Sequence, residues 1–366
     1  MKILFDFKNM EDWKKKKILY IWGAVVLIGV MFLAYGTYVL SKDRMNEDYY
    51  WDHILYEDPA VVIKVEELST AAVPVTVGTY IENLKELSLK SNYYRVVFLA
   101  WFKWDGSEDL DMKNHFRIYK GYMNKMEVVK DYHENGQNYQ LVRCDVSVTK
   151  NYWTRRFPLD SQQLKMYLES SYPVTKMVFL PDTENSKLNT NLNISGYGVR
   201  RYTNGVIDFQ YDGTHGDPEL TEAVYTSEFV TALEINRDSW GTYVKCFIAL
   251  LGTTTWVLIT LFINTYHRID PLGMLPAALF GTVSNIMVGA NLLPDALEIG
   301  LLEYVNFWGI FTILAVAFSV ININRIRNKY EDKEFAGAFG RLMFWTILIL
   351  ILAGHILLPI SAYMFD

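Results

Sequence analysis

Apolar residues gather in five long segments, which cover residues 18–40, 241–264, 273–292, 304–324 and 342–363. Each is about 20 residues long, the length that a helix needs to cross a bilayer. The first segment follows four consecutive lysines, Lys14 to Lys17. It is longer than the apolar part of a secretory signal, and no cleavage motif follows it. We therefore expect a cytoplasmic segment over residues 1–17 and an uncleaved transmembrane anchor over residues 18–40.

Between residues 41 and 239 the apolar positions alternate with polar ones instead of forming spans. The alternation is clearest in three runs, residues 142–148, 164–168 and 229–235. A period of two predicts strands with one buried face, and Asn135-Gly136 is a hairpin-turn signal. Several short strands separated by turns predict a β-sandwich over residues 41–239. The pattern leaves residues 41–70 open between a short helix and an irregular lead-in.

The segment of about residues 270–292 is long enough to span a bilayer, but glycine, alanine, threonine, serine and asparagine are threaded through it. Polar groups at membrane depth are costly unless they meet a partner or water. One face of this helix is therefore expected to look at protein or at a water-filled path. A tightly packed buried helix is the alternative, because small residues also let helices approach closely. Pro276 predicts a kink or a lost backbone hydrogen bond.

Charges in the short loops give the expected orientation. The loops at residues 265–271 and 325–341 carry basic residues, whereas the loop at residues 293–303 is acidic and has no basic residue. Basic loops favour the cytoplasmic side. With the N-terminus inside, the β domain (residues 41–239) and the C-terminus of the helical domain (residues 240–366) both lie outside. We expect an integral protein of the plasma membrane, or of the inner membrane of a bacterium, with the β domain extracellular or periplasmic.

Composition narrows the function further. The net charge is −6 and only 21% of the residues are charged, so no nucleic-acid partner is expected. The six histidines show no metal-ligand spacing, and no catalytic, phosphate-binding or dinucleotide motif is present. The two cysteines, Cys144 and Cys246, suggest no disulfide framework. We therefore expect a protein that is not an enzyme and that has no catalytic residues, metal or cofactor.

Four sequence motifs occur in an order that resembles the pentameric ligand-gated ion channels (the Cys-loop receptor superfamily). Residues 73–105 look like the first two strands of that family and close on Trp104-Asp105. The core of its signature loop is similar to Phe157-Pro158-Leu159-Asp160. Residues 227–239 resemble the last strand before the membrane, and 291–294 resemble the turn that ends the pore helix. The cysteines that bracket the loop in animal members are absent, as in bacterial members, and the N-terminal anchor is additional.

The resemblance implies a membrane protein with an extracellular β-sandwich, a four-helix transmembrane bundle and one extra N-terminal helix. It also implies a homo-oligomer, a pentamer, that conducts ions through a central pore in the lipid membrane. With Asp270 at the position of the family's acidic ring, the pore-lining residues are Asp270, Gly273, Ala277, Phe280, Ser284 and Met287. Asp270 favours cations, Phe280 is the hydrophobic constriction, and capping of the helix is a second role for Asp270. A shift of one residue gives Leu272, Pro276, Leu279 and Val283 instead.

The same resemblance implies a gating interface between the β domain and the pore. Asp160 would pair with Arg237, the alternative being an ordinary exposed ion pair. Phe157 and Pro158 would insert at the membrane surface, the alternative being plain packing, and Leu293 and Pro294 would carry the signal to the pore. The ligand, a small molecule, a proton or an ion, would meet an aromatic box suited to cations. Its candidate residues are Tyr119 (or Tyr122), Tyr172, Tyr202, Phe209 and Tyr211.

Two other functions stay open at this point. A non-conducting, membrane-anchored sensor or scaffold would keep the fold but not the pore. An enzyme with its active site in the outer domain is the second alternative, although no recognisable catalytic grouping supports it.

Overall fold

The computed structural model describes residues 10–192, 194, 196–214, 223–237, 240–293 and 298–363. The chain divides into two compact units. The first, here called the helical unit, contains residues 1–46, 154–160 and 239–366. The second, here called the β unit, contains residues 47–153 and 161–238. A short piece of the predicted signature loop, residues 154–160, therefore belongs to the helical unit.

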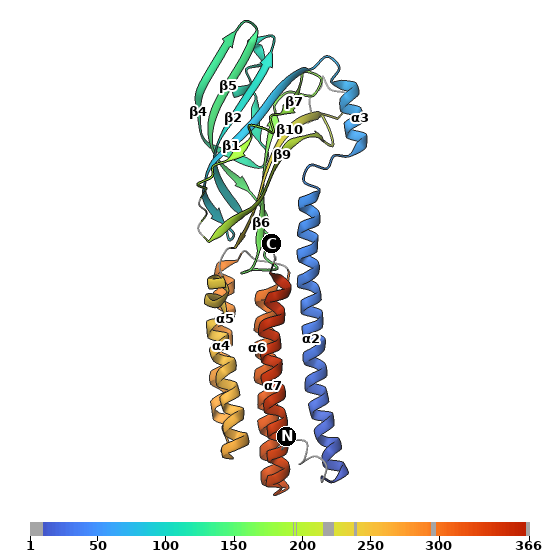
Figure 1. Cartoon of the computed structure of the whole chain (residues 1–366), viewed down its shortest axis with the longest axis vertical. Coiled ribbons are helices and arrows are strands. Elements are labelled where there is room, and N and C mark those ends of the chain that lie inside the picture. The colour runs from blue at the N-terminus through green and yellow to red at the C-terminus, as the bar shows by residue number, and fades with distance from the viewer. Residues whose placement is uncertain are drawn as a thin grey trace. The chain divides into compact units, whose positions relative to one another are not determined.

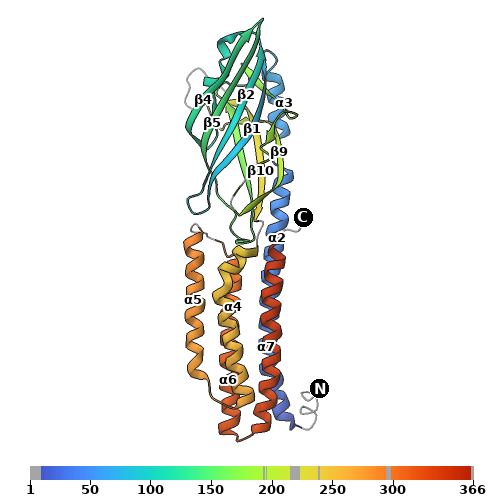
Figure 2. The ribbon, with the colours of Figure 1, turned by 60° about the vertical axis from the view of Figure 1, so that its left-hand side comes forward.

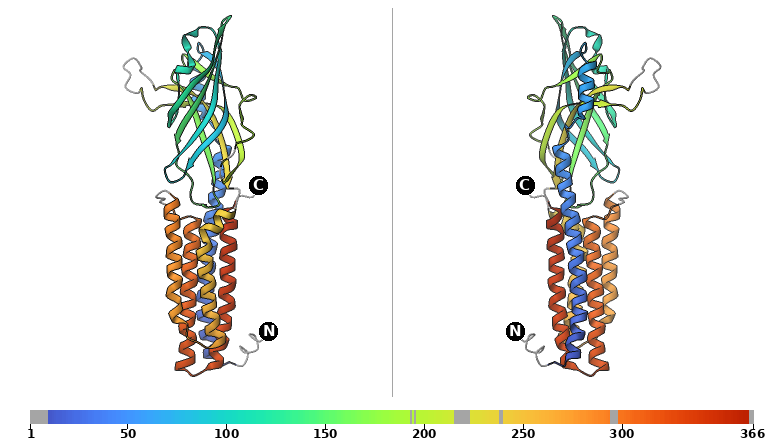
Figure 3. Two further views of the ribbon diagram at one scale, coloured as in Figure 1. Left: turned by 90° about the vertical axis from the view of Figure 1, so that its left-hand side faces the viewer. Right: turned by 90° about the vertical axis from the view of Figure 1, so that its right-hand side faces the viewer.

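The helical unit is built from long helices that run side by side (Figures 1 and 3). A five-residue π-helical turn, Ile263–His267, extends the second of them, and a 3₁₀ turn, Leu272–Met274, precedes the third. The helices are the part of α2 (Asp12–Asp52) up to residue 46, α4 (Trp240–Phe262), α5 (Leu275–Leu292), α6 (Leu301–Lys329) and α7 (Lys333–Ala362).

Four helices in the described part of the chain are long and apolar enough to cross a membrane. They cover Asp12–Asp52, Trp240–His267, Leu301–Lys329 and Lys333–Ala362. The fifth predicted span contains only a shorter apolar helix, Leu272–Met287. Pro276 does not kink it, because α5 begins one residue earlier and the proline sits in the first turn, where backbone N–H groups have no partner within the helix.

Helix α2 continues well beyond the predicted anchor. The apolar pattern ends near residue 40, but the helix runs to Asp52 because no glycine or proline interrupts residues 41–58. A second helix, α3 (Pro59–Leu68), then begins at Pro59, where the Asp58 carboxylate accepts a hydrogen bond from the Ala60 N–H at 2.9 Å. The interval left open in the sequence, residues 41–70, is therefore largely helical.

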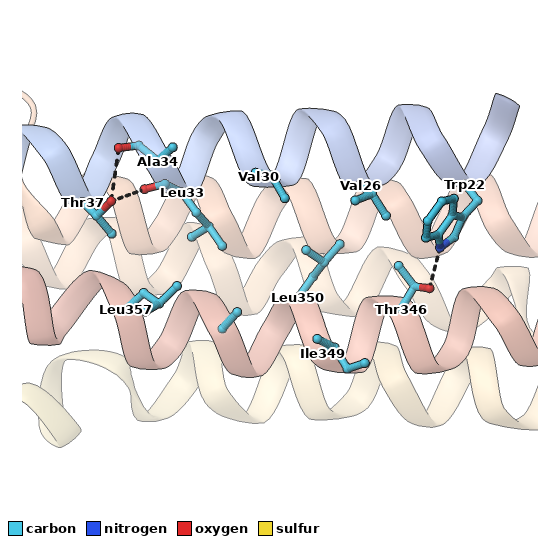
Figure 4. Close-up of a pocket in the computed structure, with 11 residues that line it drawn as sticks. Trp22, Val26, Val30, Leu33, Ala34, Thr37, Thr346, Ile349, Leu350 and Leu357 are labelled. Carbon is cyan, nitrogen blue, oxygen red and sulfur yellow. Dashed lines mark hydrogen bonds between the residues drawn. The ribbon is translucent and has the colours of Figure 1, made fainter. Parts of the chain in front are cut away.

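Helix α2 is tied to α7 and to the residues that flank it at three levels. Lys14 Nζ lies 2.6 Å from an Asp332 carboxylate oxygen, Trp22 Nε1 donates to Thr346 Oγ1 at 2.9 Å, and Arg44 donates to the Tyr363 carbonyl at 2.9 Å. Between these ties an apolar groove of about 540 Å³ remains along α2 and α7, as Figure 4 shows. The additional N-terminal helix is therefore an integral part of the helical unit.

The β unit consists of two sheets, which Figure 2 shows with the helices of the other unit. One sheet has the strand order β4-β5-β2-β1-β7, with β8 paired to β1, and the other has the order β3-β6-β10-β9. The strands are β1 (Val73–Ser88), β2 (Tyr93–Asp105), β3 (Phe116–Ile118), β4 (Gly121–Glu134), β5 (Gln137–Thr149), β6 (Ser161–Ser170), β7 (Met177–Pro181), β8 (Lys187–Leu188), β9 (Tyr197–Gln210) and β10 (Tyr225–Arg237).

The two sheets pack face to face. The hydroxyls of Thr79 on β1 and Thr231 on β10 lie 2.7 Å apart, and the rings of Phe102 on β2 and Phe116 on β3 are 5.2 Å apart. The three predicted alternating runs lie in β5, β6 and β10, and the turn at Asn135-Gly136 joins β4 to β5 with positive φ at both residues. These predictions of strands and of a hairpin are confirmed.

Strands β6 and β10 differ from the prediction of one buried face. Almost every residue of both strands is buried. The outer face of their sheet is covered by the chain that precedes the first strand: Ile54, with Trp51 beside it, packs on Val230 and Ala232 of β10. A period of two indicates which face of a strand lies inward, and it cannot show that another segment covers the outer face.

Candidate functional site

The first candidate site is the face of α5 that the rest of the chain leaves uncovered. Helix α5 packs on α4 and α6, and Figure 2 shows it at one edge of the helix group. The predicted lining residues Gly273, Ala277, Phe280, Ser284 and Met287 are all exposed, Phe280 with 75% of its surface. The residues of the alternative register, Leu272, Pro276, Leu279 and Val283, are exposed as well.

Helix geometry separates the two registers. Among the side chains of α5 that the structure describes, those outside residues 288–290, the buried ones are Leu275, Ala278, Thr282 and Asn285. At about 100° per residue, the stripe through Phe280 and Ser284 lies within about 20° of the direction opposite to this buried face. The stripe through Leu279 and Val283 lies about 70° from that direction. The register with Phe280 on the outward face is therefore the one that points furthest from the other helices of the chain.

Polar residues on the inner face of α5 hold the helix in place. Asn285 Nδ2 donates to Asn306 Oδ1 of α6 at 2.8 Å, and both side chains are buried. At Gly281 a Cβ atom would lie 2.2 Å from Thr253 Oγ1 of α4, so only glycine fits this close approach. The small and polar residues of the α5 segment therefore lie on two faces. Some pack α5 against α4 and α6, and others are exposed on the opposite face.

Loss of the asparagine pair should loosen α5. Asn285→Leu would leave a buried amide oxygen of Asn306 without its donor, which costs about 1–3 kcal/mol. We expect Asn285→Leu to unfold at a lower temperature in detergent than Ser284→Ala, a control substitution at the neighbouring exposed position. The double variant Asn285→Leu/Asn306→Leu should recover part of the loss. An unchanged melting temperature for Asn285→Leu would contradict this role.

Asp270 lies just before the 3₁₀ turn that leads into α5. Its carboxylate is exposed and accepts a hydrogen bond from the Leu272 N–H at 3.1 Å. Arg268, two residues before Asp270, has a positive φ of 61° and lies at the end of the π-helical turn. Asp270 therefore binds the 3₁₀ turn and not the first turn of α5, so the capping of the pore helix and the acidic ring both stay predictions.

The second candidate site is the loop of residues 154–160 with the ends of three helices around it. Phe157, Pro158 and Asp160 are all buried, so the two apolar residues pack inside the protein. Leu293, after α5, is buried too, whereas Pro294 lies outside the described residues. The loop therefore contacts protein through the residues that the sequence had assigned to the membrane surface.

Two arginines of this loop join the helix ends. Arg156, only 2% exposed on its side chain, places Nε 3.3 Å from an Asp43 carboxylate oxygen of α2 and donates from Nη1 to the Ala362 carbonyl of α7 at 3.1 Å. Arg155 binds Asp43 at 3.1 Å and Glu298 at 2.7 Å. The loop is thus bound to α2, to α7 and to the residues before α6.

Backbone contacts reinforce the same junction. The Arg155 carbonyl accepts a hydrogen bond from the Leu301 N–H at 2.6 Å, at the first residue of α6. At Gly300 a Cβ atom would lie 2.4 Å from the Arg155 carbonyl oxygen, so a larger residue would displace the loop. Asp43, Glu298 and Gly300 were missed in the sequence, because no local pattern links residue 43 to residues 155 and 300.

The two members of the predicted pair Asp160–Arg237 belong to different units, and the pair stays a prediction. Within the helical unit Asp160 is buried and interacts electrostatically with Arg156. Within the β unit the Arg237 guanidinium lies over the ring of Tyr197, 4.6 Å from its centroid. Each residue therefore has a contact inside its own unit that the sequence did not indicate.

Three of the predicted aromatic ligand residues come together on the β unit. Tyr119 and Phe209 have ring centroids 6.4 Å apart, and Phe209 lies edge-on to Tyr211 at 4.9 Å. The Tyr211 hydroxyl donates to the buried Glu169 at 2.5 Å, and Arg117 forms a two-pronged ion pair with the same carboxylate at 2.8 and 2.9 Å. The Arg117–Glu169 pair fixes this cluster, and sequence reasoning missed it.

The other two aromatic candidates lie elsewhere. Tyr172 stacks on His115 at 4.7 Å, and Lys176 Nζ lies 3.6 Å from its ring centroid, so the chain itself supplies a cation to this ring. Tyr202 pairs with Leu233 across β9 and β10, and burial raises the pKa of its hydroxyl to about 12. Tyr122 is 73% exposed.

A cavity of about 250 Å³ opens beside Tyr119 and Phe209, with Tyr167 and Glu228 in its wall. Glu228 is buried on β10. Burial, reinforced by the nearby Glu169 carboxylate and opposed by Arg117, raises the pKa of Glu228 to about 7. Sequence reasoning did not single out this residue, because β10 contains several polar positions, among them a second carboxylate, Glu234.

The raised pKa of Glu228 predicts how stability depends on pH. Between its ordinary value of 4.5 and about 7, the unfolded chain releases a proton that the folded chain retains. The free energy of unfolding should therefore fall as pH rises through this window and level off above it, by at most about 3 kcal/mol. Glu228→Gln should melt higher at pH 8 and lose this slope, whereas Glu66→Gln on the exposed side of α3 should keep it. A parallel slope in Glu228→Gln would count against the assignment.

Comparisons with known proteins leave the family of this chain unassigned. No family model and no curated protein matches the sequence. In the part of the chain that the structure describes, no group of three or more histidine, cysteine, aspartate or glutamate residues could hold a metal ion.

Proposed function

We propose that this protein is a homo-oligomeric ion channel of the pentameric ligand-gated type, with α5 lining a central pore. The observation that carries the proposal is the outward stripe through Gly273, Ala277, Phe280, Ser284 and Met287, which lies opposite the face of α5 that packs on α4 and α6. Five copies arranged around one axis would cover this face and enclose a path.

The orientation rests on charge. The basic loops at residues 265–271 and 325–341 would lie in the cytoplasm, and the β unit would lie outside. A signal from a ligand bound to the β unit would reach α5 through residues 154–160, which already contact α2, α6 and α7. Asp270, exposed at the start of the α5 segment, would favour cations at the cytoplasmic mouth.

A non-conducting sensor or scaffold on the same fold is the second candidate. The apolar character of the exposed α5 face favours it, since Leu279, Phe280, Val283 and Met287 are large, apolar and exposed. Such a face can close a pore by dewetting, or it can bind lipid or another helix without any pore. The distinction is therefore functional and needs a measurement of flux.

Reconstituted protein separates the two candidates. Purified full-length protein in liposomes should pass monovalent cations, and images along the membrane normal should show five copies with α5 on the axis. In the variant Ser284→Cys, a water-soluble methanethiosulfonate should block this flux, whereas Thr282→Cys on the buried face should be insensitive; native Cys144 and Cys246 are buried. Flux that is absent at every pH, with α5 facing lipid, would overturn the channel proposal.

A further inference from the structure

A second cavity in the β unit lies next to the aromatic cluster and has a different chemistry. Its volume is about 270 Å³. Three elements line it: Tyr50 at the end of α2, residues 149–153 after β5, and the outer face of β6. It shares Thr149, Lys165 and Tyr167 with the cavity beside Phe209.

Two lysines face this cavity, Lys150 from the loop and Lys165 from β6. Both are half-buried, and in the described part of the chain neither has a carboxylate within 4.0 Å. Burial lowers the pKa of Lys150 to about 8, and repulsion from Lys165 contributes to the lowering. Buried cations in proteins are normally paired, so the cavity has two positive groups without a counter-charge.

The charged groups of the adjoining cavity do not supply that counter-charge. Glu228 lies in its wall together with Lys120, but its pKa is raised by burial and by Glu169, and Arg117 is the cation that acts on it. Lys120 itself lies over the ring of Tyr119 at 5.1 Å. The excess of positive charge at Lys150 and Lys165 is thus local.

The remaining lining residues are the aromatic Tyr50, Trp153 and Tyr167 and the polar Thr149, Asn151 and Gln163. The rings of Tyr50 and Trp153 lie 5.3 Å apart, and Tyr167 closes the side toward the other cavity. The amide of Gln163 is engaged, because its Nε2 donates to the Glu47 carbonyl at 2.7 Å. A volume near the lower end of small-molecule pockets, about 300 Å³, suits a ligand of few atoms.

We propose that this cavity is a binding site for a small organic anion, whose carboxylate meets Lys150 and Lys165 and whose apolar part contacts Tyr50, Trp153 and Tyr167. The site does not depend on ion conduction, so it can be tested whether or not the channel proposal holds. A bound carboxylate would supply the missing counter-charge and keep both ammonium groups protonated.

Thermal unfolding of the full-length protein in detergent tests the proposal. Acetate, succinate, benzoate and inorganic phosphate would be titrated at constant ionic strength, with chloride as the reference. At least one organic acid should raise the melting temperature saturably, and Lys150→Met or Lys165→Met should weaken its apparent affinity tenfold or more. Lys125→Met is the matched control, because Lys125 is exposed and pairs with Glu127. A shift of equal size in all variants, or a response to phosphate alone, would overturn the proposal.

Amine labelling of the wild-type protein provides a second readout that needs no variant. A lysine with a pKa of about 8 reacts faster with an acylating reagent at pH 8 than Lys125 does, and the effective organic acid should slow the labelling of Lys150 selectively. Labelling of Lys150 that no organic acid changes would overturn the proposal. Slow labelling in the oligomer without added acid would instead assign the counter-charge to a second copy of the chain, and would also overturn it.

Discussion

Replacement of Arg156 by methionine should lower the free energy of unfolding by about 3–5 kcal/mol, the cost of breaking a buried ion pair by removing one partner. Arg156 is buried and reaches both Asp43 of α2 and the Ala362 carbonyl of α7. Without it, a largely buried Asp43 carboxylate keeps only Arg155, and the Ala362 carbonyl loses a charged donor. The melting temperature in detergent, followed by size-exclusion fluorescence, measures the loss.

The matched control is Arg143→Met. Arg143 also pairs with a carboxylate, Glu82 at 2.7 Å, but 47% of its side chain is exposed. Exposed pairs contribute at most about 1 kcal/mol. Arg156→Lys keeps the positive charge but can make only one of the two contacts. Its stability should therefore lie between those of the wild-type protein and Arg156→Met. Equal losses for Arg156→Met and Arg143→Met would show that the junction at residues 154–160 does not depend on this arginine.

Substitution of Phe280 by serine should raise ion flux through reconstituted protein by about tenfold or more, if the outward stripe of α5 surrounds a pore. Phe280, with 75% of its surface exposed, is the most exposed large apolar residue among the described side chains of α5. In a ring of copies it would form an apolar constriction that excludes water, and a hydroxyl at this position would let water remain. Flux of a monovalent cation into liposomes, at matched protein density, gives the comparison.

The control for this variant is also the test of register. Leu279→Ser places the same hydroxyl on the neighbouring stripe, which lies about 70° from the outward direction. It should leave flux unchanged. If Leu279→Ser raises flux and Phe280→Ser does not, the alternative register through Leu272, Pro276 and Val283 is the one that lines the path.

The elements that periodicity predicts well are those whose environment is uniform along their length. Strands β5, β6 and β10 have an apolar inner face at every second position, and the long helices of the helical unit show as apolar runs. The hairpin at Asn135-Gly136 follows from positive φ at both residues. The alternating strands, the apolar helices and the hairpin each depend on residues close together in the sequence, so they can be predicted from it.

Contacts between distant segments could not be predicted in this way. The cover that Trp51 and Ile54 give to β10 and the joining of Asp43 to Arg155 and Arg156 involve residues more than a hundred positions apart. The cavity with Lys150 and Lys165 likewise depends on Tyr50 lying across β6. In the sequence, these two lysines are ordinary polar positions.

The sequence by itself determined the apolar spans and the alternating strands, because each is a periodic property of one segment, but it left two registers of the α5 segment open. Only the tertiary structure decided which face of α5 is left uncovered, which carboxylate neutralises Arg156 and which lysines have none. Those outcomes depend on desolvation, and desolvation is set by whichever distant segment covers a residue.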